Sequence, residues 1–165
     1  MTAAAFWDFT KFQGAEGLQN LHPLIVHYPI ALLTASVPIY FLAWLLHSEP
    51  LEAIGFWLLG LGTIGAAAAA YTGWMGSQGV MIAPSARDHI LVYHQWLMVT
   101  VLLLSVLLAG WALVARPMPQ RGRSLFMMGL VLMTLVLAKG ADYGGWMVFG
   151  YNAGGSLPQP IEFSQ

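Results

Sequence analysis

The chain alternates between long apolar runs and short polar breaks, and this pattern predicts four membrane-spanning helices. The apolar runs cover about 24–46, 53–74, 90–115 and 124–138. The last run continues through Lys139 and Asp142 into further apolar residues, so its helix is expected to end near 149. Each run is close to the roughly 20 residues that a helix needs to cross the hydrocarbon core of a bilayer. The predicted fold is therefore all-α, a four-transmembrane-helix bundle.

The polar breaks divide the chain into three parts. Residues 21–150 form the predicted transmembrane domain, in which HSEPLE joins the first two helices and RPMPQRGRS the last two. Residues 1–20 precede it, and their four aromatic side chains favour an interfacial helix or, alternatively, contact with a partner subunit. Residues 151–165 form a C-terminal tail. The first 20 residues do not have the charge and hydropathy pattern of a secretory signal peptide.

Composition supports an integral membrane protein in contact with the lipid bilayer. Hydrophobic residues make up 58% of the chain and charged residues only 8%, whereas soluble domains average roughly 25% charged residues. The absence of cysteine excludes disulfides, thiolate-bound iron–sulfur clusters and covalent attachment of c-type haem. The net charge of -1 gives no support for nucleic acid binding.

Basic residues predict the orientation in the membrane. The loop between the last two helices carries Arg116, Arg121 and Arg123, which are half of the six basic residues. Because loops rich in Lys and Arg stay in the cytoplasm, this loop is expected there. Both termini then face outward, which is the periplasm for a multi-pass protein of a bacterial inner membrane.

Two histidine pairs with the spacing H-x4-H are the strongest candidate site. His22 and His27 lie near the start of the first helix, and His89 and His94 near the start of the third. Ionisable groups in membrane spans are costly and often mark functional sites. In the predicted topology both pairs lie at the outer face. Together they indicate a site for haem or for another metal, although histidines at helix ends also serve as plain interfacial residues.

Helix geometry separates the two members of each pair. Five residues along a helix rotate the side chain by about 140°, so both members cannot point at one axis. The deeper residues, His27 and His94, are the expected axial ligands of a haem b, because helix bundles hold haem by one imidazole from each of two helices. His22 and His89 are expected to hold haem propionates, relay protons or act as second ligands. One haem is expected, and two remain the alternative.

Small residues near the histidines would leave space for a large planar cofactor such as haem. Thr34 lies on the same helix face as His27, and Gly73 is one of several small residues in the second helix. Both are expected to contact the cofactor, although membrane helices also use small residues for close packing. Lys139 and Asp142 are three residues apart, which allows an ion pair on one helix face.

A resemblance to a known family supports a redox role. HPLIVHYPIALL resembles the HPxxVHFPIAL signature of a family of bacterial membrane proteins known as a domain of unknown function. The dipeptide TG at 72–73, the second histidine group and the segment GGWMVFGYNAGG are also similar to the pattern of this family. The likeness covers about 20–155. Such domains resemble membrane redox modules that occur beside cytochrome c or Rieske-type domains. The resemblance thus implies all four histidines as site residues.

The predicted function is that of a haem b electron-transfer subunit of a larger redox complex rather than a free-standing enzyme. Its expected partners are other membrane and periplasmic subunits. Cytochrome c or quinone is expected to exchange electrons with it. Two alternatives stay open. The histidines could instead bind copper, iron or zinc without porphyrin, because imidazole suits all three metals, or the chain could be a cofactor-free structural or anchor subunit.

Overall fold

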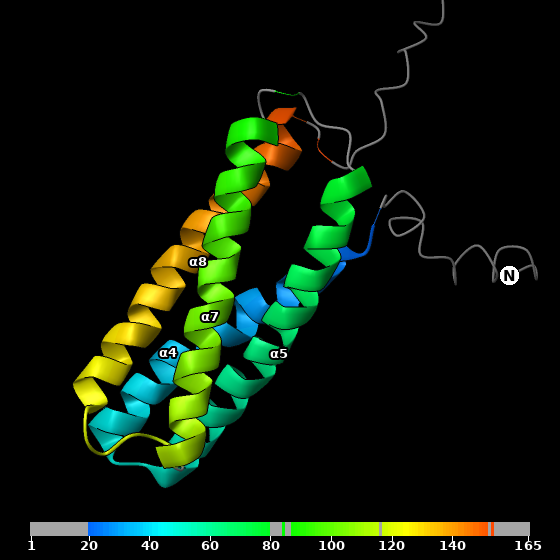
Figure 1. Cartoon of the computed structure of the whole chain (residues 1–165). Helices are drawn as coiled ribbons and strands as arrows, with labels where there is room; N and C mark the ends of the chain where they lie inside the picture. Colours follow the sequence, from blue (N-terminus) through cyan, green and yellow to red (C-terminus); the bar gives the residue numbers. More distant parts are fainter. Residues whose placement is uncertain (1–19, 80–83, 85–86, 116, 152, 154–165) are drawn as a thin grey trace, which may run out of the picture.

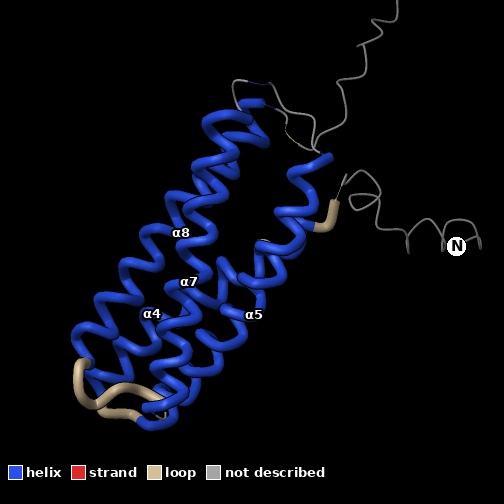
Figure 2. Tube along the Cα trace, in the orientation of Figure 1, coloured by secondary structure: helices blue, strands red, loops and turns tan. Residues whose placement is uncertain are grey.

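The computed structural model describes residues 20–79, 84, 87–115, 117–151 and 153, and in this part of the chain all regular structure is helical. Helices α3 (His22–Ile25) and α4 (His27–Leu46) are followed by α5 (Glu49–Gly79). The π-helical turn η1 (Arg87–Leu91) leads into α7 (Val92–Ala115), and α8 (Arg123–Tyr151) completes the bundle. Figures 1 and 2 show the long helices side by side, joined by short loops. The predicted all-α fold is confirmed.

Four segments are long and apolar enough to cross a membrane. They are His22–Leu46, Glu49–Gly79, Arg87–Ala115 and Arg123–Tyr151. The four predicted spans are therefore confirmed, including the continuation of the last helix past Lys139 and Asp142. The second helix reaches five residues beyond the predicted end at 74. The predicted N-terminal segment and most of the C-terminal tail lie outside the described residues.

The first span is interrupted between α3 and α4. Pro29 has no N–H to donate to the carbonyl group of Ile25, so one helical hydrogen bond is missing at this point. Val26 connects the two helices with φ −60° and ψ −25°, close to helical values, and its N–H still donates to the carbonyl oxygen of His22 at 3.1 Å. The chain direction is thus largely kept, and His22 begins the span.

Successive helices run antiparallel and form two hairpins, one of α4 with α5 and one of α7 with α8. The hairpins pack through α5 against α7 and through α4 against α8. Fully buried side chains on all four helices form the core between them, among them Leu33, Leu59, Ala112 and Leu130. The outer faces expose large apolar side chains such as Val114 and Leu135, as expected for contact with lipid.

The hairpins bring the end of α5, η1 and the end of α8 to the upper end of the bundle in Figure 1, and the start of the first span lies lower, beside the last turns of α5. His22, His27, His89 and His94 therefore lie toward the same end, as the sequence predicted. The two short loops that join α4 to α5 and α7 to α8 lie at the other end.

Candidate functional site

Two of the four histidines meet between the hairpins. The rings of His22, at the start of α3, and His94, in the first turn of α7, have centroids 6.4 Å apart and planes at 83° to each other. Both side chains are half-buried. One imidazole thus comes from each hairpin, as predicted, but the partner of His94 is the first histidine of the chain rather than the second.

The His22 ring is held by the end of α5. Its Nδ1 lies 3.0 Å from the carbonyl oxygen of Ala69 and 3.4 Å from Oγ1 of Thr72. A carbonyl oxygen only accepts, so Nδ1 carries the proton and donates it. The backbone N–H of His22 donates to Oδ1 of Asn20 at 3.0 Å, which fixes the start of the helix.

The His94 ring is held in the same way by α8. Its Nδ1 donates to the carbonyl oxygen of Gly140 at 2.8 Å. In each neutral ring this leaves the lone pair on Nε2, the atom that binds a metal when Nδ1 is anchored to the backbone. The two hydrogen bonds therefore fix the tautomer of each neutral ring and leave its Nε2 without a proton.

Two glycines allow the rings to approach the neighbouring helices. A Cβ on Gly73 of α5 would lie 2.8 Å from Cε1 of His22, and a Cβ on Gly144 of α8 would lie 3.2 Å from Cε1 of His94. Gly76 likewise allows close approach of the Asn20 side chain, since a Cβ added at Gly76 would lie 2.9 Å from the Asn20 amide nitrogen. The predicted site residue Gly73 thus contacts His22, whereas the role of Gly144 and of the two carbonyl groups was not predicted.

His27, Thr34 and His89 are not brought to this pair. His27 and Thr34 lie on the exposed face of α4, turned away from the core that Leu33 enters. His89 is exposed in η1, while the next residue, Ile90, is buried. The assignments of His27 as an axial ligand and of Thr34 and His89 as cofactor contacts stay predictions, and none of these residues contacts the His22–His94 pair in this structure.

The predicted pair of Lys139 and Asp142 is present on α8. Lys139 Nζ lies 2.8 Å from Oδ2 of Asp142, and both side chains are more than half exposed. The same ammonium group lies 4.7 Å from the centroid of the Tyr143 ring, which stacks on Tyr93 at 5.9 Å. This cluster is on the outer surface, next to the histidine end of the bundle.

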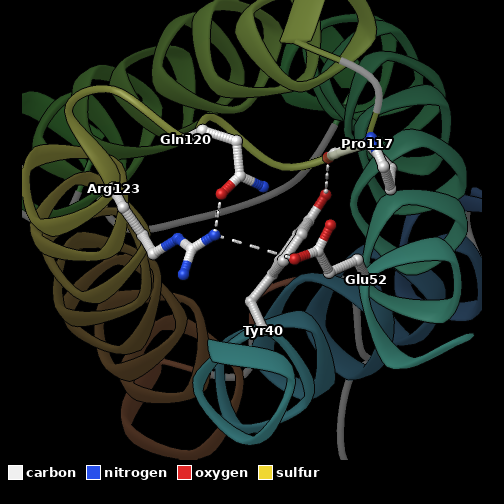
Figure 3. A network of polar contacts seen from close by, with 5 residues as sticks. All are labelled: Tyr40, Glu52, Pro117, Gln120 and Arg123. Carbon is white, nitrogen blue, oxygen red and sulfur yellow. Dashed lines mark hydrogen bonds and ion pairs between the residues drawn. The ribbon is translucent and has the colours of Figure 1, made fainter. Parts of the chain in front are cut away.

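A second polar cluster lies at the opposite end, between the hairpins. Figure 3 shows Glu52 of α5 and Arg123 of α8 turned toward each other within the ring of helices. Arg123 Nη2 is 3.9 Å from Oε1 of Glu52 and also contacts Oε1 of Gln120. Tyr40 donates its hydroxyl proton to the carbonyl oxygen of Pro117 at 3.1 Å. This cluster joins the ends of both hairpins.

The donor set of the site is two imidazoles. Within the described ranges, no three His, Asp or Glu side chains gather closely enough to hold a metal ion together. A group bound here by the described residues would therefore take its protein ligands from His22 and His94.

Comparison with known proteins places the chain among membrane proteins. Residues 18–156 match a family described as predicted membrane protein (DUF2231). No curated protein matches the chain, and no solved structure matches it.

Proposed function

We propose a redox function for this chain, which belongs to the DUF2231 family of predicted membrane proteins. In this proposal His22 and His94 are the axial ligands of one haem b, and the protein is an electron-transfer subunit of a larger membrane complex. The observation that carries it is the facing pair of imidazoles, each supplied by a different hairpin and each anchored through Nδ1.

The separation of the two rings suits a shared metal ion. Two imidazoles that bind one ion from opposite sides, through bonds of about 2.0 Å, have their centroids roughly 6 Å apart. The ring centroids of His22 and His94 are 6.4 Å apart. The centroid separation of the pair therefore matches that of two imidazoles that share one ion.

The number of ligands favours haem over a non-haem metal. Zinc sites usually take three or four protein ligands, whereas a haem iron takes its equatorial ligands from the porphyrin and two axial ones from the protein. Two anchored imidazoles are what the described part of the chain offers. Haem b also needs no cysteine, which this chain lacks.

The position of the pair explains why partners are needed. His22 and His94 lie near the starts of the first and third spans, at the same end of the bundle, and no second close pair of histidine rings occurs in the described residues. A single haem there exchanges electrons at one face and does not carry them across the bilayer. Periplasmic or membrane subunits, with cytochrome c or quinone as the exchange partner, are the expected donors and acceptors.

A reduced-minus-oxidised absorbance spectrum of the purified full chain, with a pyridine haemochrome assay, tests the proposal. We expect a b-type spectrum at one haem per chain. Replacing His22 or His94 by Ala is expected to abolish the six-coordinate spectrum while the protein still inserts into membranes. His27→Ala, on the exposed face of the same span, distinguishes this ligand pair from the His27–His94 pair predicted from the sequence and is expected to keep it.

Two outcomes would overturn the proposal. A folded preparation that binds copper, iron or zinc but no porphyrin would show a non-haem site. A preparation that binds neither metal nor haem, even after incubation with haemin, would leave a structural or anchoring role.

A further inference from the structure

The contact that holds His22 occurs a second time at His94. His22 donates to the carbonyl group of Ala69, 47 positions later, and packs against Gly73, four residues further on. His94 donates to the carbonyl group of Gly140, 46 positions later, and packs against Gly144, again four residues further on. Each hairpin therefore presents its histidine to its own second helix in the same manner.

The same register holds along α5 and α8. The shift from Ala69 to Gly140 is 71 positions, and under this shift every residue of 61–73 has the same degree of burial as its counterpart in 132–144. Exposure agrees in number as well, since Ile64 and Leu135 are 68% and 64% exposed. Thr63 and Thr134 correspond too, and each donates to the carbonyl oxygen four residues before it, at 2.7 and 3.0 Å.

The first helices of the hairpins correspond as well. The shift from His22 to His94 is 72 positions, and it carries four of the five buried residues of α4 onto the buried residues of α7. Pro29, Leu33, Ser36 and Tyr40 correspond to Val101, Ser105, Leu108 and Ala112, all of them buried. The side chains differ in type, so the correspondence lies in the packing register and not in residue identity.

We infer that the chain is a tandem repeat of one helical hairpin, with a two-fold axis along the bundle. The His22–His94 site lies on this axis. It binds one metal-centred group, and each repeat supplies one ligand. Parallel repeats related by an axis along the membrane normal are known in membrane proteins. Glu52 and Arg123 also correspond under the 71-position shift, and they meet at the other end of the bundle. Equivalent residues thus face each other at both ends of the axis.

The repeat explains the different placement of the other two histidines. Under the 72-position shift His27 corresponds to Val99, and His89 corresponds to Gly17. Neither has a histidine as its counterpart, and both are exposed. Only His22 and His94 are therefore related by the axis. The repeat predicts one bound group per chain, rather than two groups that together use all four histidines.

Cross-linking in the full chain tests the repeat without any ligand. The chain has no cysteine, so paired cysteines can be introduced cleanly. Thr63 Oγ1 lies 3.4 Å from the carbonyl oxygen of Ser105 across the two hairpins, so T63C/S105C is expected to form a disulfide cross-link under a mild oxidant, read on a non-reducing gel. The repeat predicts the same cross-link for the equivalent pair, L33C/T134C. The outward-facing pair I64C/L135C is the control and is expected not to react.

The cross-link is detected by cutting a protease site introduced between positions 79 and 87, after which joined halves migrate together in a denaturing gel. Cross-linking of T63C/S105C and L33C/T134C to similar extents supports the repeat. Cross-linking of T63C/S105C alone, or equal reaction of I64C/L135C, would overturn it.

Haemin titration tests the position of the bound group, and this part rests on the proposed function. We expect saturation at one haem per chain, with H22A and H94A losing six-coordination equally and regaining it when free imidazole is added. H47A, whose exposed side chain lies after the last residue of α4 at the other end of the bundle, is the control. Saturation at two haems, or dependence on only one of the two histidines, would place the group off the axis. Failure of any haem to bind would overturn the proposed function, while the cross-links still decide the repeat.

Discussion

At the scale of single residues, the site depends on backbone groups that hold the imidazoles in place. The carbonyl groups of Ala69 and Gly140 fix the tautomers of His22 and His94. Such hydrogen bonds to the second nitrogen raise the basicity of a ligating imidazole and orient it. The two glycines that contact the rings provide the means to disturb this orientation without removing a ligand.

We expect Gly73→Ala to weaken haem binding more than Gly144→Ala. The new Cβ would lie 2.8 Å from Cε1 of His22 in the first case and 3.2 Å from Cε1 of His94 in the second. Turning a ring out of its preferred rotamer costs about 0.5–1.5 kcal/mol, which corresponds to roughly two- to tenfold weaker binding. Haemin titration measures the effect. Gly60→Ala is the control, because a Cβ there meets nothing within 4 Å, and equal loss in all three variants would contradict the explanation.

The residue scale also shows where sequence reasoning reaches its limit. Two H-x4-H pairs suggest that the first members correspond to each other and the second members likewise. The structure instead brings His22, the first member of one pair, next to His94, the second member of the other. The burial and register of each helix, rather than the local motif, decide which ring faces inward. Gly73 was predicted from its small size. The acceptor carbonyl groups were not, since any residue type carries one.

At the scale of helices, hydropathy was sufficient to predict all four spans. Length and apolar content are properties of the local sequence, and a helix satisfies its own backbone groups within the bilayer. The break at Val26 follows from Pro29, and the close packing of the hairpins from glycines such as Gly62, whose Cβ would lie 2.7 Å from Leu33. Which helix faces pack together was not predictable from a pattern that is apolar on every side.

The ion pair between α5 and α8 is expected to stabilise the contact of the hairpins. Glu52 and Arg123 have side chains only 10% and 17% exposed, and the Nε of Arg123 is buried with no hydrogen-bond partner among the described residues. Glu52→Gln removes the negative charge beside this mostly buried guanidinium and is therefore expected to destabilise the protein by about 1–3 kcal/mol. Thermal unfolding in detergent measures this loss.

The exposed pair on α8 provides the comparison for this measurement. Lys139 and Asp142 have side chains 57% and 66% exposed, and exposed ion pairs contribute about 0–1 kcal/mol. Lys139→Gln is therefore expected to change the unfolding temperature far less than Glu52→Gln. A double-mutant cycle with Arg123→Gln should show coupling to Glu52. If the two single variants are equally mild, the contact between Glu52 and Arg123 does not hold the hairpins together.

At the scale of the whole molecule, the two ends of the bundle differ in chemistry. The histidine pair and the Lys139–Asp142–Tyr143 cluster lie toward one end, and the Glu52–Arg123 pair lies at the other with the loop that carries Arg121. The sequence predicted this division, because hydropathy sets the number of crossings and the crossings set which segments share a side. It did not reveal the repeat, since the two hairpins share a packing register and only a few identical residues, such as His22 and His94.

The orientation of the bundle follows from this division and can be measured directly. Because the positive-inside rule places the Arg121 loop in the cytoplasm, the histidine end is expected in the periplasm. Single cysteines at the exposed residues Gln78, at the end of α5, and Gln120, in the arginine loop, mark the two ends. A membrane-impermeant maleimide is expected to label Q78C in intact spheroplasts, and Q120C only after lysis. The reverse pattern would put the histidine site in the cytoplasm and exclude a periplasmic electron partner at that end.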